Sequence, residues 1–115
     1  MDTIQASARF PNIAPDKLSE FKRLVAEAVE ATKGEPGCLH YDWFFNADET
    51  VCEAREVYAN SDAVLAHMAG AAALLGQLIE LGGGIKIDCF GSASPALVEA
   101  AAALNPNYFA HFQGK

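Results

Sequence analysis

Apolar and polar residues alternate over residues 3–10, which is the pattern of a strand with one buried face. The apolar side carries Ile4, Ala6, Ala8 and Phe10, and Pro11 ends the strand. The period then changes, because apolar residues recur every three or four positions from Leu18 to Val29. This spacing predicts an amphipathic helix that begins near Pro15 and ends at Lys33-Gly34.

Two further strand-like runs, at 38–46 and 50–58, flank a polar turn and predict an antiparallel hairpin. The pattern leaves the register of this hairpin open. If Asn46 lies opposite Thr50, His40 and Glu56 share one face of the sheet. A shift by one residue places Tyr41 beside Glu56 instead, because a single slip exchanges the two faces of a strand.

The second half of the chain predicts another helical region, a strand, a short helix and a final extended segment. Asn60 or Ser61 can cap the helical region, Gly70 is expected to divide it, and three glycines end it at 82–84. Its expected inward positions are Val64, His67, Leu74, Leu75, Leu78 and Ile79. A strand is predicted at 85–90, a helix between Ser94-Pro95 and Asn105-Pro106, and an extended segment at 108–112.

This order of elements predicts an α+β, ferredoxin-like fold, in which a four-stranded antiparallel sheet packs against two helices. With 115 residues, we expect a single domain over 1–115, with a core at 3–92 and a C-terminal extension at 93–115. Large apolar residues occupy both alternating faces of the hairpin, whereas helices would cover only one. We therefore expect a second copy of the chain to cover the other face, which predicts a homodimer.

Composition and charge exclude several classes of partner. Fifteen acidic and eight basic residues give a net charge of −7 without a basic cluster, so we expect no nucleic acid partner. No uninterrupted apolar run reaches the roughly 18 residues of a membrane span, and the N-terminus lacks the pattern of a signal peptide. These observations predict a cytoplasmic protein that does not interact with a membrane.

The three cysteines, Cys38, Cys52 and Cys89, are an odd number and fall in strand-like segments. They are expected to be buried free thiols. Because the sequence has no Cys-x-x-Cys pair and no two histidines at helical spacing, we expect no metal site.

Two side chains stand out as candidates for acid–base chemistry. His67 lies in the apolar stripe of the second helical region, where it is either a hydrogen-bonded core residue or an acid–base group. Glu56 lies in a strand, on a wet edge or facing a cavity. In a cavity its pKa would rise unless a cation paired with it, and His67 is an available partner because the chain reverses between them. His40 and His111 are weaker candidates.

Three aromatic residues, Tyr41, Trp43 and Tyr58, are candidates for a binding wall. Their flat faces could stack on an aromatic ligand while their polar atoms make hydrogen bonds. Ordinary packing of the sheet would explain them equally well.

Four segments together resemble the antibiotic biosynthesis monooxygenase family: Glu35-Pro36-Gly37-Cys38, Leu39-His40-Tyr41, Glu56-Val57-Tyr58 and Ala63-Val64-Leu65-Ala66-His67. The resemblance implies a dimeric α/β barrel with an apolar pocket between the sheet and the helices of each subunit. It also implies oxygenation of a small phenolic or quinol-type substrate without flavin, haem or metal, with molecular oxygen as co-substrate. By this resemblance Glu56 and His67 would be catalytic, and Tyr41, Trp43 and Tyr58 would bind the substrate.

The chain departs from the family pattern in two places. Residues 70–73, Gly-Ala-Ala-Ala, stand where relatives often carry polar or aromatic side chains. The first strand offers Gln5 and Ser7 in place of the asparagine of the haem-degrading branch, which disfavours haem degradation. The extension after Gly91 is expected to cover the pocket or the sheet edge of a partner. The alternative functions are an isomerase of a small carbonyl metabolite and a non-catalytic, dimeric protein that binds a small ligand.

Overall fold

A five-stranded sheet forms the frame of the computed structural model, which describes residues 2–115. Its strands are β1 (Ile4–Phe10), β2 (Cys38–Phe45), β3 (Cys52–Tyr58), β4 (Lys86–Phe90) and β5 (Asn107–Phe109). They lie in the order β2-β3-β1-β4-β5, and the pairing is antiparallel except between β4 and β5. The predicted α+β, ferredoxin-like fold is confirmed, but the sheet has one more strand than expected.

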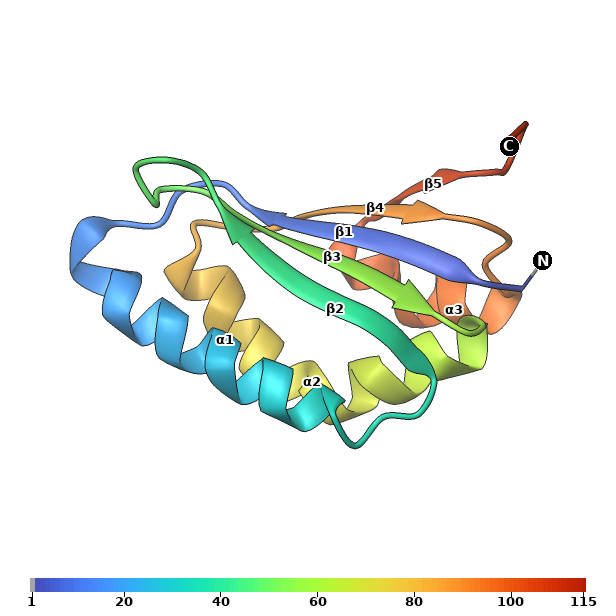
Figure 1. The fold of residues 1–115 in the computed structure, drawn as a ribbon, viewed down its shortest axis with the longest axis horizontal. Helices are drawn as coiled ribbons and strands as arrows, with labels where there is room; N and C mark the ends of the chain where they lie inside the picture. The colour runs from blue at the N-terminus through green and yellow to red at the C-terminus, as the bar shows by residue number, and fades with distance from the viewer. Residues whose placement is uncertain (1) are drawn as a thin grey trace.

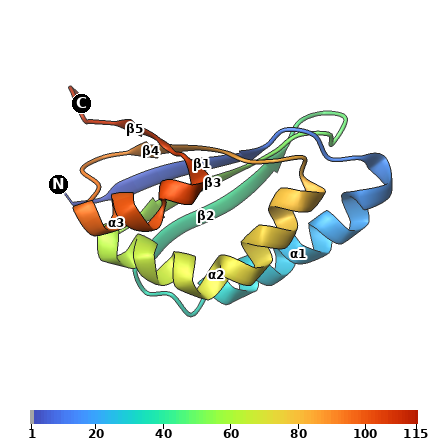
Figure 2. The same cartoon turned by 180° about the vertical axis from the view of Figure 1, so that it is seen from behind.

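The helices lie on one face of this sheet (Figures 1 and 2). They are α1 (Leu18–Thr32), α2 (Ser61–Leu81) and α3 (Pro95–Ala100), with short 3-10 turns at Pro15–Lys17 and Ala102–Leu104. Phe21, Leu24 and Ala28 of α1 are buried against the sheet, as their spacing predicts. The prediction that Gly70 divides the second helical region was wrong, because α2 is continuous. Gly70 lies in open space among good helix formers, which tolerate one glycine.

An aromatic cluster fills the core beneath one end of the sheet. The ring of Phe10 on β1 stacks on Trp43 of β2 at a centroid distance of 5.6 Å and meets Phe21 of α1 edge-on at 5.4 Å. Such pairs contribute about 0.5–1.5 kcal/mol each beyond the burial of their area. The cluster therefore joins the sheet to α1 and fixes the side chain of Trp43.

The register of the β2–β3 hairpin places Tyr41 directly opposite Glu56. The other alternative, with His40 and Glu56 on one face, is wrong. The turn that sets the register is held by Asn46, whose side chain accepts hydrogen bonds from the backbone N–H groups of Thr50 and Val51. The register is irregular between Cys38 and His40, so Leu39 leaves the alternation and is half exposed.

Helix α2 corrects the expectation that no segment is apolar enough to span a membrane. By length and composition it could do so, with a mean hydropathy of 1.5 over an 18-residue window, of which 11% is buried. The sequence reading missed this because single polar residues such as His67 and Gln77 interrupt the apolar run. In this fold one face of α2 contacts the sheet and α1, and its outward positions are mostly alanine and glycine.

Within the described residues, no helix covers the opposite face of the sheet (Figures 1 and 2). That face carries charged pairs, such as Arg9 with Glu53 at 2.7 Å, and exposed aromatic rings. Phe44 is 56% exposed, and Phe90 stacks on Phe109 at 5.2 Å. The C-terminal extension covers the edge of its own sheet, since β5 pairs with β4 of the same chain.

Candidate active site

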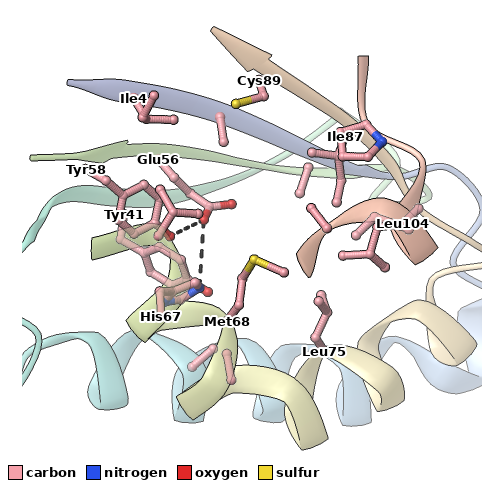
Figure 3. A pocket seen from close by; sticks show the side chains of 18 of the residues that line it. Ile4, Tyr41, Glu56, Tyr58, His67, Met68, Leu75, Ile87, Cys89 and Leu104 are labelled. Atoms are coloured by element: carbon pink, nitrogen blue, oxygen red, sulfur yellow. Dashed lines mark hydrogen bonds and ion pairs between the residues drawn. The ribbon is translucent and has the colours of Figure 1, made fainter. Parts of the chain in front are cut away.

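A cavity of about 100 Å³ lies between the sheet, α2 and the C-terminal extension. The five residues that the sequence singled out all line it: Tyr41, Trp43, Glu56, Tyr58 and His67. Figure 3 shows that Tyr41, Glu56, Tyr58 and His67 gather at one end, whereas Leu75, Ile87 and Leu104 form the other. The cavity thus has a polar end and a long apolar remainder.

The polar end is built where β3 turns into α2. Only Ala59 and Asn60 separate the two elements, and the Asn60 side chain caps the helix by accepting a hydrogen bond from Ala63 N–H at 2.9 Å. This short reversal brings the Nε2 atom of His67 to 3.8 Å from Oε1 of Glu56. Both side chains are 12% exposed. The chain reversal therefore brings the predicted pair together.

Glu35 holds the other side of the histidine ring. Its Oε1 lies 2.9 Å from Nδ1 of His67. Glu35 reaches this position because the following turn approaches α2 closely: a Cβ atom on Gly37 would meet the Cβ of Ala63 at 2.5 Å. Only glycine allows this approach. When Glu35 is a carboxylate it can only accept a hydrogen bond, so in the neutral ring that fits this contact Nδ1 carries the proton and donates the hydrogen bond. Nε2 is then unprotonated and faces Glu56 as an acceptor.

Burial raises the pKa of Glu56 above its ordinary value of 4.5, because the carboxylate loses its water. The hydrogen bond from the Tyr58 hydroxyl and the nearby His67 oppose this rise, whereas the charge of Glu35 adds to it. Glu56 therefore keeps its proton to higher pH than an ordinary carboxyl group. A carboxyl group that holds its proton over a wider pH range than usual thus lies 3.8 Å from an imidazole nitrogen.

The two tyrosines at the polar end are neutral hydrogen-bonding groups. Burial, followed by the charge of Glu56, raises the pKa of both Tyr41 and Tyr58. The Tyr41 and Tyr58 rings lie 5.2 and 5.4 Å from the His67 ring and enclose it. The Nε1–H group of Trp43 is buried and lies close enough to the Tyr41 hydroxyl to oppose the rise in the pKa of Tyr41, but the geometry of the pair falls short of a hydrogen bond. A buried donor without a partner costs about 1–3 kcal/mol, which an acceptor on a ligand would recover.

Neither cysteine chemistry nor a metal centre finds support at this site. Burial, with the charges of Glu35 and Glu56, raises the pKa of the Cys38 thiol to about 11, so the thiolate is scarce near neutral pH. In residues 2–115, no group of three or more His, Cys, Asp or Glu side chains is placed to hold a metal ion.

A family model for antibiotic biosynthesis monooxygenases matches residues 4–75, which include Glu35, Glu56 and His67. This match covers well over half of the 115 residues. The chain belongs to the antibiotic biosynthesis monooxygenase family. No curated protein matches it significantly.

Solved structures extend the likeness beyond the family segment. MupZ from Pseudomonas fluorescens is 28% identical, with a TM-score of 0.86, and the alignment covers 100% of this chain and 94% of that one. Rv0793 from Mycobacterium tuberculosis is 24% identical over 82% of this chain and 98% of that one, with a TM-score of 0.70. SnoaB from Streptomyces nogalater, a cofactor-independent oxygenase, is 18% identical over 82% and 96%, with a TM-score of 0.68. The last two support the fold alone.

One contribution to this monooxygenase-family site escaped the sequence reading, and another was expected only as one of two alternatives. Glu35 appeared only as part of a motif, because a carboxylate in a turn gives no periodic signal. The extension supplies Leu97, Leu104, Pro106 and Tyr108 to the cavity wall, so it covers the pocket of its own chain. His40 lies on the opposite face of the sheet, and His111 is exposed in the tail, so neither belongs to the site.

Glu35→Ala tests whether Glu35 fixes the His67 ring. We expect ¹⁵N NMR of the ring to change from one protonated nitrogen, Nδ1, to a mixture, and kcat to fall by about 10²–10⁴, as when a carboxylate that orients a catalytic histidine is altered. Glu30→Ala, at an exposed carboxylate on α1, is the matched control. An unchanged ring spectrum in Glu35→Ala would show that the contact does not set the tautomer.

Proposed function

We propose that this protein is a cofactor-independent monooxygenase that oxygenates a small phenolic or quinol-type substrate in the cavity. The observation that carries the proposal is the placement of Glu56, with its raised pKa, opposite a histidine that a second carboxylate holds. Membership of the monooxygenase family supports the same class of reaction. In this proposal Glu56 and His67 are catalytic, and Tyr41, Trp43 and Tyr58 bind the substrate.

The first step is removal of the substrate proton. Because 3.8 Å is less than twice a hydrogen-bond length of about 2.8 Å, one hydroxyl oxygen can lie within reach of both Nε2 of His67 and Oε1 of Glu56. His67 accepts the proton from that hydroxyl, and the Glu35 carboxylate stabilises the imidazolium that forms. The substrate becomes an electron-rich phenolate enclosed by apolar walls.

The second step is the reaction of this anion with oxygen. This anion is the enolate form of an activated CH₂ group, so the carbon that reacts has already lost one hydrogen as the proton now on His67. The enolate transfers an electron to O₂, a C–O bond forms at that carbon, and His67 returns its proton to give a hydroperoxide. His67 then removes the remaining hydrogen of the carbon as a proton while the O–O bond breaks to leave a carbonyl, Glu56 protonates the departing hydroxide to give water, and the proton on His67 returns to Glu56. Overall, CH₂ and O₂ become C=O and H₂O. The substrate supplies all the electrons, so the reaction needs no external reductant.

Oxygen uptake tests this proposal. We expect purified protein, shown by absorbance and elemental analysis to be free of flavin, haem and metal, to accelerate oxygen consumption by a panel of anthrones, which carry the activated CH₂ group, in proportion to protein concentration. Uptake at the uncatalysed rate across the panel, or uptake that requires added flavin or metal, would contradict the proposal.

A second candidate is an isomerase of a small carbonyl metabolite. The same acid–base pair favours it, because an acid and a base that face one small cavity can move a proton along a carbonyl substrate without oxygen. Turnover that continues under strict anaerobiosis would favour the isomerase. If no substrate is turned over in air or without it, a non-catalytic binding protein is the better description.

The homodimer is a further part of the proposal. The sheet face opposite the helices combines exposed Phe44, Phe90 and Phe109 with charged pairs, a mixture typical of an interface. We expect light scattering at micromolar concentration to give twice the mass of the chain, and Phe44→Asp to shift the mass toward that of the monomer. A wild-type protein that is monomeric at this concentration would contradict the dimer. A cytoplasmic location stays a prediction.

A further inference from the structure

The cavity is much longer than the polar end requires. Its wall follows one face of α2 from Val64 to Leu78, a rise of about 21 Å at 1.5 Å per residue. The polar side chains that Figure 3 labels, Tyr41, Glu56, Tyr58 and His67, gather at the end near His67. From there the wall continues past Met68 to the side chains of Leu75, Ile87 and Leu104. A small phenol held at the polar end would not contact the wall near Leu104.

The charges around the cavity restrict what fills it. Among the described residues that line the cavity, none is lysine or arginine. Its ionisable groups near the polar end include Glu56, and Glu35 lies just behind His67. A substrate that arrives as an anion would therefore lose its water without meeting a permanently charged cation, at a cost of several kcal/mol. The cavity selects against carboxylates and phosphates.

The C-terminal extension closes the apolar end. Leu97 is buried on α3, and Leu104 and Pro106 follow it in the wall. These residues lie outside the segment 4–75 that the family model matches. The part of the site that limits the length of a ligand is thus separate in sequence from the part that carries the acid–base pair.

We infer that the substrate is a neutral molecule with one oxygen-bearing head and an aliphatic tail, and that Leu104 in the C-terminal extension limits the length of the tail. This inference rests on the proposed function in taking Glu56 and His67 as the position of the head. The tail lies along α2 and ends under the extension.

Binding of 4-alkylphenols, measured by anaerobic titration calorimetry so that no turnover occurs, tests the inference. Affinity is expected to rise about fourfold per added methylene, the equivalent of about 0.8 kcal/mol, until the tail reaches Leu104. 4-Alkylbenzoates of equal length are expected to bind at least tenfold more weakly. An affinity that does not depend on tail length, or benzoates that bind as tightly as phenols, would overturn the inference.

Variants of Leu104 locate the end of the tail. Leu104→Phe should move the best-bound phenol to a shorter chain, and Leu104→Ala should move it to a longer one. Val98→Phe and Val98→Ala, at an exposed position on α3, are matched controls that should leave the optimum unchanged. Circular dichroism checks the fold, and if Leu104→Phe fails to fold, Leu104→Ala still decides. If Leu104→Ala and wild type bind phenols of the same chain length best, Leu104 does not limit the length of the tail.

The binding experiments and the oxygen-uptake experiment can fail independently of each other. Tail-dependent binding without oxygen uptake would leave the inference standing and reject the monooxygenase. Oxygen uptake that is equally fast with tailed and untailed substrates, together with affinity that does not depend on the tail, would support the monooxygenase and reject the inference.

Discussion

His67→Ala is expected to lower kcat by about 10²–10⁴ while the protein stays folded, because the variant loses the group that accepts the substrate proton. Among residues 2–115, the ring makes no hydrogen bond to the backbone; its polar and aromatic interactions are with Glu35, Glu56 and two tyrosine rings. Steady-state kinetics with the best substrate from the oxygen-uptake panel measures the effect.

Two further variants make the His67 result specific. His67→Gln keeps a polar side chain of similar length and should be as inactive as His67→Ala, since an amide cannot accept and return a proton at neutral pH. His111→Ala removes an exposed histidine from the tail and should keep wild-type activity. Undiminished turnover in His67→Ala with an intact circular dichroism spectrum would remove His67 from the mechanism.

Glu56→Gln is expected to lower kcat by about 10²–10⁴ as well, but to stabilise the protein above pH 4.5. The glutamine can still accept the hydrogen bond of Tyr58, whereas it has no proton to give to the departing oxygen. A loss of turnover together with a gain in stability is typical of a residue kept for chemistry.

The pH dependence of that gain follows from the direction of the pKa shift. The folded-state pKa of Glu56 is raised, so between pH 4.5 and that pKa the folded protein binds more protons at this group than the unfolded chain does. Its ionisation therefore destabilises the fold as pH rises through this window. Below pH 4.5 the free energies of unfolding of wild type and variant should approach each other.

Urea unfolding of Glu56→Gln and wild type over a series of pH values measures this difference. The variant's free energy of unfolding should exceed that of wild type by an amount that grows with pH and then levels off. Glu99→Gln, at an exposed position on α3, should show no such growth. A Glu56→Gln variant that loses stability as pH rises, relative to wild type, would mean that Glu56 is stabilised as a carboxylate.

The sequence predicted those helices and strands that depend on a local pattern, such as alternation of apolar residues or a capping side chain. The alternation of Ile4 to Phe10 gave β1, and the cap at Asn60 gave the start of α2, because side-chain facing and capping are local properties. The short reversal between Tyr58 and Ser61 also predicted that Glu56 and His67 would meet. These features depend on neighbours within a few residues.

The features that the sequence did not reveal depend on contacts between distant segments. The register that pairs Tyr41 with Glu56 is set jointly by the Asn46 turn and by the irregularity at Leu39, and neither has a strong sequence signal. β5 exists because residues 107–109 find the free edge of β4, and Glu35 reaches His67 because Gly37 packs on α2. Only the assembled fold shows such proximities.

We predict that Glu56 keeps its proton to a higher pH than an ordinary carboxyl group does while it faces His67. An infrared difference spectrum between wild type and Glu56→Gln, recorded over a pH series, isolates the carbonyl stretch of this one group. We predict that the band of the protonated acid persists above pH 4.5 and is replaced by carboxylate bands only at higher pH. Replacement of the acid band by carboxylate bands at or below pH 4.5 would contradict the account.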